Sequence, residues 1–153
     1  MTVKKKVLFI LMLVLIGQFV GYAQDHTEKT AKELLMSKEW RLDNHIIVQK
    51  YVNDTIYFRI LPYPYSMDLP EVYYLSDVFV KEFDENLVGN SSGVKYLYTR
   101  GCRGQSSFRI YEIKKLSEEK VHLYLIYNSA DPDGTAVVIG RKILERTYIP
   151  YKE

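Results

Sequence analysis

Cys102 is the residue whose chemistry would be easiest to activate, because two arginines flank its glycine-containing segment. The positive charges of Arg100 and Arg103 could favour the thiolate, which is the reactive form of cysteine. No histidine lies near it in sequence to act as a base. We interpret Cys102 as an incidental loop cysteine, with a reactive free thiol or a crosslink between chains as the alternatives. A single cysteine also excludes an internal disulfide.

The three histidines do not form a metal-binding pattern. His26, His45 and His122 are widely separated, and no His-x-x-x-His or Cys-x-x-Cys spacing occurs. Asp131 and Asp133 flank a proline and precede a glycine, which is turn chemistry and lacks the spaced ligands of a calcium loop. We therefore expect no metal site.

Acidic residues near the middle of the chain are the remaining candidates for catalysis. Glu82, Asp84 and Glu85 could form an acid–base pair, but carboxylates at the end of a strand usually face water. The chain has no Gly-x-Ser-x-Gly motif, no phosphate-binding glycine loop and no nucleotide fingerprint. We expect no catalytic residues and no cofactor, and we predict that the protein is not an enzyme.

A tyrosine- and proline-rich segment, 61–69, is a candidate contact surface. It carries Tyr63, Tyr65 and Met67 between prolines, in a chain with 14 tyrosines. Tyrosine offers a large apolar ring and a polar tip at low entropic cost, which suits contact with a protein partner. The alternative is that these rings only cover the outside of the domain.

The N-terminus has the form of an export signal. Lys4, Lys5 and Lys6 precede an apolar run from Val7 to Ile16, and small residues lead to Ala23. The apolar run is shorter than the ~20 residues that a membrane-spanning helix needs. We predict a signal peptide over 1–23, cleaved after Ala23, and a periplasmic or secreted mature protein with no membrane span and no lipid-attachment cysteine.

The remainder, 24–153, has the length of one domain, at 130 residues. Without the three lysines of the signal, the formal charge of +2 becomes −1, and acidic and basic residues are interspersed. This balance argues against a nucleic-acid partner.

The order of apolar runs predicts the secondary structure. Helical spacing of Ala31, Leu34 and Leu35 predicts one short amphipathic helix over 25–37, with Thr27 as its cap. From Glu39 onward β-forming residues dominate. We predict eight strands, at 40–49, 55–61, 72–75, 78–83, 94–99, 108–115, 120–127 and 135–148, with a loop at 62–70.

Short turns between successive strands predict a mostly β fold, an eight-stranded antiparallel up-and-down barrel with a short N-terminal helix. In the first run, alternation places Trp40, Leu42, Ile46 and Val48 on one face, with Gln49 on the other. In the seventh run, Val121, Leu123 and Leu125 share a face.

The order of several short motifs resembles that of bacterial lipocalin-like domain proteins. These motifs are Lys38-Glu39-Trp40, the run from Val72 to Asp77, Phe83-Asp84, Val88-Gly89 before the run from Gly93 to Leu97, and the run from Tyr111 to Ile113 followed by Leu116-Ser117. The resemblance covers most of 34–148. It implies an antiparallel barrel with a structural tryptophan, matched by Trp40, closing its floor, and a small apolar molecule bound in the barrel mouth.

Two functions follow. The first is an exported lipocalin-like protein that binds a small apolar or amphiphilic ligand inside the barrel. The second is an envelope protein-interaction module with a solid core, which contacts a protein partner through 61–69. The candidate ligand-binding residues, expected to point inward, are Phe58, Tyr74, Tyr96, Phe108, Leu123 and Leu125.

Overall fold

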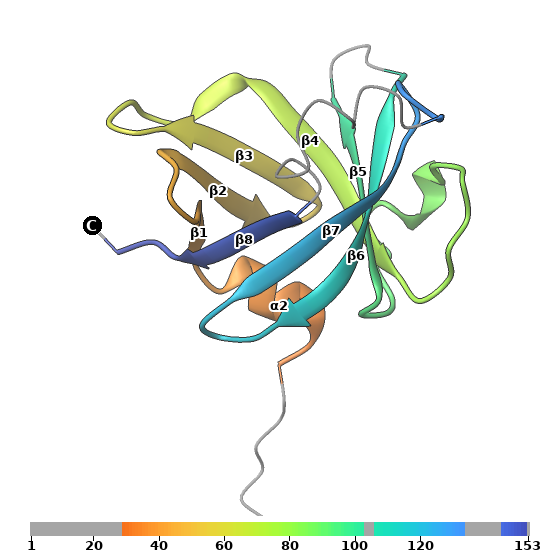
Figure 1. Cartoon of the computed structure of the whole chain (residues 1–153), viewed down its shortest axis with the longest axis horizontal. Coiled ribbons are helices and arrows are strands. Elements are labelled where there is room, and N and C mark those ends of the chain that lie inside the picture. The colour runs from red at the N-terminus through yellow and green to blue at the C-terminus, as the bar shows by residue number, and fades with distance from the viewer. Residues whose placement is uncertain (1–28, 103–105, 134–144, 153) are drawn as a thin grey trace, which may run out of the picture.

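The chain folds into a closed β-barrel. A computed structural model describes residues 29–102, 106–133 and 145–152, without the side chains of 66–69. Each strand pairs antiparallel with the next, and the last pairs with the first (Figure 1). The predicted eight-stranded up-and-down barrel with a short N-terminal helix is confirmed. The strands are β1 (Glu39–Leu42), β2 (Ile47–Val52), β3 (Thr55–Ile60), β4 (Ser66–Ser76), β5 (Tyr96–Gly101), β6 (Phe108–Leu116), β7 (Val121–Asn128) and β8 (Glu145–Pro150).

Helix α2 (Ala31–Met36) lies across one end of the barrel (Figure 1). Its first turn is held by a capping box, in which Thr30 Oγ1 accepts from the Glu33 amide at 3.2 Å and Glu33 Oε2 accepts from the Thr30 amide at 2.7 Å. The helix is therefore shorter than predicted, and its cap is Thr30. The predicted cap, Thr27, and the predicted signal peptide lie outside the described residues.

We call the end of the barrel that α2 covers the helix end, and the opposite end the loop end. The connections 53–54, 77–95 and 117–120 lie at the helix end, and the connections 43–46 and 61–65 lie at the loop end. Lys32 Nζ contacts Asp54 Oδ1 at 2.6 Å, which joins α2 to the β2–β3 turn. The turns predicted after Val52 and after Leu116 are confirmed, since Asn53 adopts a φ of 54° and Ser117 N donates to Lys120 O at 3.0 Å.

The first predicted strand, 40–49, is wrong because it contains two strands and a turn. Asn44 has a φ of 59°, and His45 N donates to Leu42 O at 3.0 Å. Asparagine tolerates this left-handed conformation better than most residues. The turn shifts the alternation, so that Gln49 pairs with Trp40 and faces the interior, whereas Val48 lies on the outer face.

The predicted strand 78–83 is also wrong. This segment belongs to the long connection 77–95, which contains the short 3₁₀-helix η1 (Glu85–Leu87). The hydroxyl of Tyr98 accepts from Val80 N at 2.8 Å and lies 3.0 Å from Val78 O. A side chain therefore binds backbone groups that a neighbouring strand would otherwise pair.

β4 begins inside the predicted loop 62–70, so the prediction is wrong over 66–70. The β3–β4 pairing shifts between Ile56, opposite Glu71, and Phe58, opposite Ser66, so 67–70 bulge out of the ladder. Pro70 has no amide hydrogen, and a bulge is where a strand tolerates it. At the other end of the chain, the predicted strand 135–148 is observed from Glu145, and 134–144 lie outside the described residues.

Two hydrophobic clusters stabilise this fold. The interior cluster fills the barrel on the side of α2. The outer aromatic cluster, which is centred on the buried residues Tyr74, Tyr98 and Ile110, lies between the barrel wall and the connection 77–95. The buried members of the interior cluster are Ala31, Leu35, Trp40, Tyr51, Ile56, Tyr73, Leu75, Leu97, Tyr111, Val121, Leu123, Leu125 and Tyr148.

Candidate functional site

The barrel interior is filled by side chains over the part that the structure describes. Trp40 is fully buried, and its Nε1 donates to Leu35 O of α2 at 2.9 Å. Next to the interior cluster lies a cavity of about 10 Å³, which has room for about one water molecule. A pocket for an organic ligand usually measures ~300 Å³ or more. The cavity is lined by Gln49, Tyr51, Ile56, Glu71, Leu97, Thr99, Tyr111, Leu123, Arg146 and Tyr148.

The lining of this cavity is polar on one side. Gln49 Nε2 donates to the hydroxyl of Tyr148 at 3.0 Å, and the hydroxyl of Tyr51 donates to Gln49 Oε1 at 3.2 Å. Arg146 lies near the hydroxyl of Tyr148, and its guanidinium lies 5.3 Å from the centre of the Tyr111 ring. These contacts form one polar network, which borders the interior cluster.

Burial keeps the phenols of this network protonated. Desolvation raises the pKa of Tyr51 well above its usual value, and it raises those of Tyr111 and Tyr148 as well. Each phenol therefore stays neutral at physiological pH and can donate a hydrogen bond. The sequence prediction missed this network, because Gln49 was placed on the outer face. The alternation of Arg146 and Tyr148 in β8 is the sequence signal that could have shown it.

The structure divides the six predicted ligand-binding residues between the two clusters. Leu123 and Leu125 are buried in the interior cluster, and Phe58 packs against it. Tyr74, Tyr96 and Phe108 do not point inward as expected, but lie on the outside of the barrel in the outer aromatic cluster. Each of the three lies next to an inward-pointing residue of its own strand. Because successive side chains of a strand point to opposite faces, it points outward.

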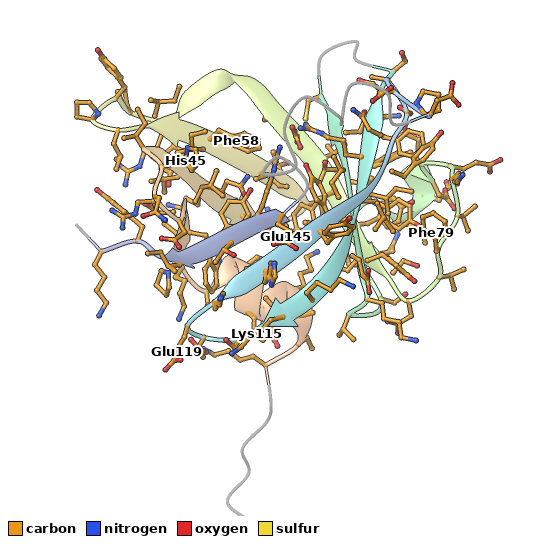
Figure 2. All side chains as sticks on the ribbon, viewed as in Figure 1. His45, Phe58, Phe79, Lys115, Glu119 and Glu145 are labelled. Atoms are coloured by element: carbon orange, nitrogen blue, oxygen red, sulfur yellow. The ribbon has the colours of Figure 1, made fainter. Side chains whose placement is uncertain are left out.

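The outer aromatic cluster fixes the connection 77–95 to the barrel wall. The rings of Tyr74 and Tyr98 stack with centroids 4.5 Å apart, and Phe83 contacts Tyr74 at 5.1 Å and Phe108 at 6.1 Å. Figure 2 shows Phe79 of the same connection at the outer edge of the molecule, far from Phe58 and His45. These aromatic side chains have a structural partner and do not line the interior cavity.

Three apolar side chains are exposed together at the loop end, and we call them the apolar tip. Ile46, Ile60 and Tyr63 are 59%, 53% and 68% exposed. Their backbones are directly connected, because Leu61 N donates to Ile46 O and Tyr63 N donates to Ile60 O, both at 2.8 Å. The Leu61–Pro62 peptide bond within this turn is cis.

Of the other predicted partner-contact residues, Tyr65 is partly buried and packs against the barrel wall. Its ring lies 5.0 Å from the guanidinium of Arg59, which also lies 4.8 Å from the ring of Tyr151. Arg59 in turn contacts Glu39 Oε2 at 2.9 Å. Desolvation is the main reason why the pKa of Tyr65 is raised. The side chain of Met67 lies outside the described residues.

Cys102 is exposed, and its environment does not activate it. Desolvation, together with the nearby charge of Glu71, raises the pKa of its thiol, and Arg100 opposes this shift only in part. The expected effect of Arg100 on the thiolate is therefore outweighed, and Arg103 lies outside the described residues. Arg100 instead forms an ion pair with Glu85.

Two of the remaining candidate residues, Asp84 and His122, have contacts within the fold. Asp84 Oδ1 caps η1 by accepting from Asn86 N at 2.9 Å, and His122 Nε2 lies 4.0 Å from Glu145 Oε2. His45 is exposed at the loop end, and His26 lies outside the described residues. Within the described ranges, no group of three or more His, Cys, Asp or Glu side chains is placed to hold a metal ion.

Comparisons with protein-family models, with curated proteins and with solved structures give no match to this chain. Among the helices in the part of the chain that the structure describes, none combines the length and the apolar character needed to cross a bilayer.

Proposed function

We propose that the protein is an interaction module that binds a partner protein through the apolar tip at the loop end. The observation that carries this proposal is the exposure of Ile46, Ile60 and Tyr63 on two neighbouring turns that a main-chain hydrogen bond joins. In the described part of the barrel, side chains of the polar network and the interior cluster line a cavity of about 10 Å³. The surface at the loop end therefore offers more apolar area to a partner than the described interior offers to a ligand.

The apolar tip is presented on a rigid support, which reduces the entropy lost on binding. Three main-chain hydrogen bonds hold the turns that carry it, from His45, Leu61 and Tyr63. Tyr65 follows the tip and packs on Arg59. Tyrosine is enriched at the centre of protein interfaces, and Tyr63 is the most exposed of the three side chains.

The predicted export signal supports a function in the periplasm or outside the cell. We propose that the domain folds after export, as a lipocalin-like barrel, and that its partner is an envelope or secreted protein. The small apolar ligand inside the barrel remains a second hypothesis, supported by the resemblance described above. A melting temperature that rises with one member of a panel of lipids and haems would support this second hypothesis.

A pull-down tests the main proposal. The purified wild-type protein, Tyr63→Ala and Ile60→Ser would be used as baits against an envelope extract, with Phe79→Ala as the matched control on another face. Phe79 is 41% exposed and lies away from the apolar tip. We expect the wild type and the control to retain the same partner and the two tip variants to lose it. Equal capture by all four baits would refute the proposal.

A further inference from the structure

The connection 77–95 exposes consecutive apolar residues on the outside of the barrel, and we call 78–82 the edge segment. Val78, Phe79 and Val80 are 64%, 41% and 48% exposed. Figure 2 shows Phe79 at the outer edge of the molecule, where a second molecule can reach it. Valine and phenylalanine favour strands, but the edge segment is not paired with any strand in the described part of the barrel.

Tyrosine hydroxyls bind the main chain of the edge segment at every second residue. The hydroxyl of Tyr98 accepts from Val80 N at 2.8 Å and lies 3.0 Å from Val78 O. The hydroxyl of Tyr74 lies 3.5 Å from Glu82 O. In a strand, the main-chain groups of successive residues point to opposite edges. The two tyrosines therefore occupy one edge of the segment, in the place of a neighbouring strand.

The residues between these positions, Phe79 and Lys81, leave the other edge open. Among the described residues, none is hydrogen-bonded to the amide or to the carbonyl of either residue. Free amides and carbonyls on a strand edge are a template for pairing with another chain. The chain bends at Lys81, so the open edge is short and suits a short strand pair.

Contacts with the barrel wall hold the edge segment in this orientation. The ring of Phe79 lies 5.7 Å from that of Tyr96, and Lys81 Nζ lies 5.4 Å from the centre of the Tyr127 ring. With these two side chains on the wall, the side chain of Val80 between them is directed away from the barrel. A partner would thus meet an ordered segment, which reduces the entropy lost on binding.

We propose that two copies of this chain pair through the open edge, antiparallel and centred on Val80. In this register Phe79 lies opposite Lys81 of the partner subunit, so the free amides and carbonyls of both residues are paired. Val80 then contacts Val80 of the partner subunit. A register centred on Lys81 would place two lysines opposite each other, and like charges in that position are destabilising. The edge segment is separate from the apolar tip, so this pairing does not rest on the proposed function.

Analytical ultracentrifugation of the wild-type protein tests the pairing. The protein would be studied from about 10 μM to about 1 mM, because a short strand pair gives weak association. We expect the average mass to rise from that of one chain toward that of two. A protein that stays monomeric over the whole range would overturn the proposal.

Exchanging the charge at Val80 tests the register. Val80→Lys and Val80→Glu each place like charges opposite each other, so each variant alone should stay monomeric, whereas an equimolar mixture should associate. The matched control is Ile46→Lys at the apolar tip, where 59% of the side chain is exposed, and it should associate as the wild type does. A mixture that stays monomeric, or loss of association in Ile46→Lys, would overturn the proposal.

Amide hydrogen exchange in the wild-type protein tests the main-chain pairing without any substitution. We expect the amides of Phe79 and Lys81 to exchange more slowly as the protein concentration rises. The amide of Val80 is the internal control, because it already donates to Tyr98 and should not change. Exchange at Phe79 and Lys81 that does not depend on concentration would overturn the proposal.

Discussion

Two groups of side chains at opposite ends of the barrel differ in their burial. At the helix end, Trp40 is buried against α2, and Glu118 holds Lys29 and Lys38, each at 2.5 Å. At the loop end, Ile46 and Tyr63 remain exposed on tight turns. The buried indole and the ion pairs of Glu118 therefore contribute to stability, while Ile46 and Tyr63 keep apolar area free for binding. Substitutions at the two ends should accordingly affect different measurements.

The largest expected effect is at the helix end, for Trp40→Ala. Removing the buried indole leaves a cavity under α2 and an unpaired carbonyl at Leu35, so we expect the free energy of unfolding to fall by about 3–5 kcal/mol. Urea unfolding measures it. The control Trp40→Phe keeps most of the apolar contact, so its free energy of unfolding should fall by less. A loss below about 1 kcal/mol for Trp40→Ala would contradict the role assigned to this end.

The next effect concerns Gly93, in the connection 77–95. Its φ is +112°, and an added Cβ would lie 2.5 Å from the backbone nitrogen of Asp77. We expect Gly93→Ala to destabilise the fold by about 2–4 kcal/mol, because strain and a backbone clash combine. Gly89→Ala is the matched control, since its Cβ would meet only the side chain of Asp54 at 3.1 Å. Equal losses for both variants in urea unfolding would contradict this difference.

A smaller effect is expected for the capping box of α2. Thr30→Ala removes the acceptor of the Glu33 amide and should cost about 1 kcal/mol in unfolding free energy. Thr30→Ser keeps the hydroxyl and should restore most of this loss. If serine and alanine were equivalent in chemical denaturation, the hydroxyl would not contribute as a cap.

The ion pairs of Glu118 predict a pH effect at the same end. Hydrogen bonds from Lys29 and Lys38 lower the pKa of Glu118 to about 2. Because this pKa lies below that of the unfolded chain, the stabilisation is present above ~pH 4.3 and is lost as the pH falls through about 2. Carboxyl chemical shifts in NMR would show the low midpoint. Since Glu118 is exposed, high salt should raise its pKa toward the usual value.

The smallest effect on stability is expected at the loop end. Tyr63 is 68% exposed, so Tyr63→Ala should change the free energy of unfolding by no more than about 0.5 kcal/mol while abolishing partner capture. Denaturation curves and pull-downs on the same preparation would separate the two effects. A loss of stability comparable to that of Thr30→Ala would mean that the ring supports the fold.

The sequence predicted the barrel because turn residues and β-forming runs are local signals. It failed where a single residue or a distant contact decides the structure. The turn at Asn44 divides one apolar run into two strands. The hydroxyl of Tyr98 is hydrogen-bonded to the backbone of Val78 and Val80, which do not pair with a strand. These two errors offset each other, so the predicted number of strands was right.

For the candidate site, the sequence drew attention to the turn that carries Tyr63, but it did not show the polar network of the interior. The segment 61–69 was recognised by its tyrosines and prolines, and the structure shows Tyr63 at its tip. Ile46 and Ile60 could not be joined to it from sequence, since strand register brings them together. The polar network was hidden for the same reason, because Gln49 lies in β2 and its partner Tyr148 lies in β8.

The pairing of β1 with β8 has a consequence for how this chain is made. Trp40 lies opposite Pro150, so the ring of strands cannot close until residue 150 has left the ribosome. Contacts so distant in sequence form slowly. Slow closure of the ring would suit the export that we propose, because it leaves the chain unfolded for longer after synthesis.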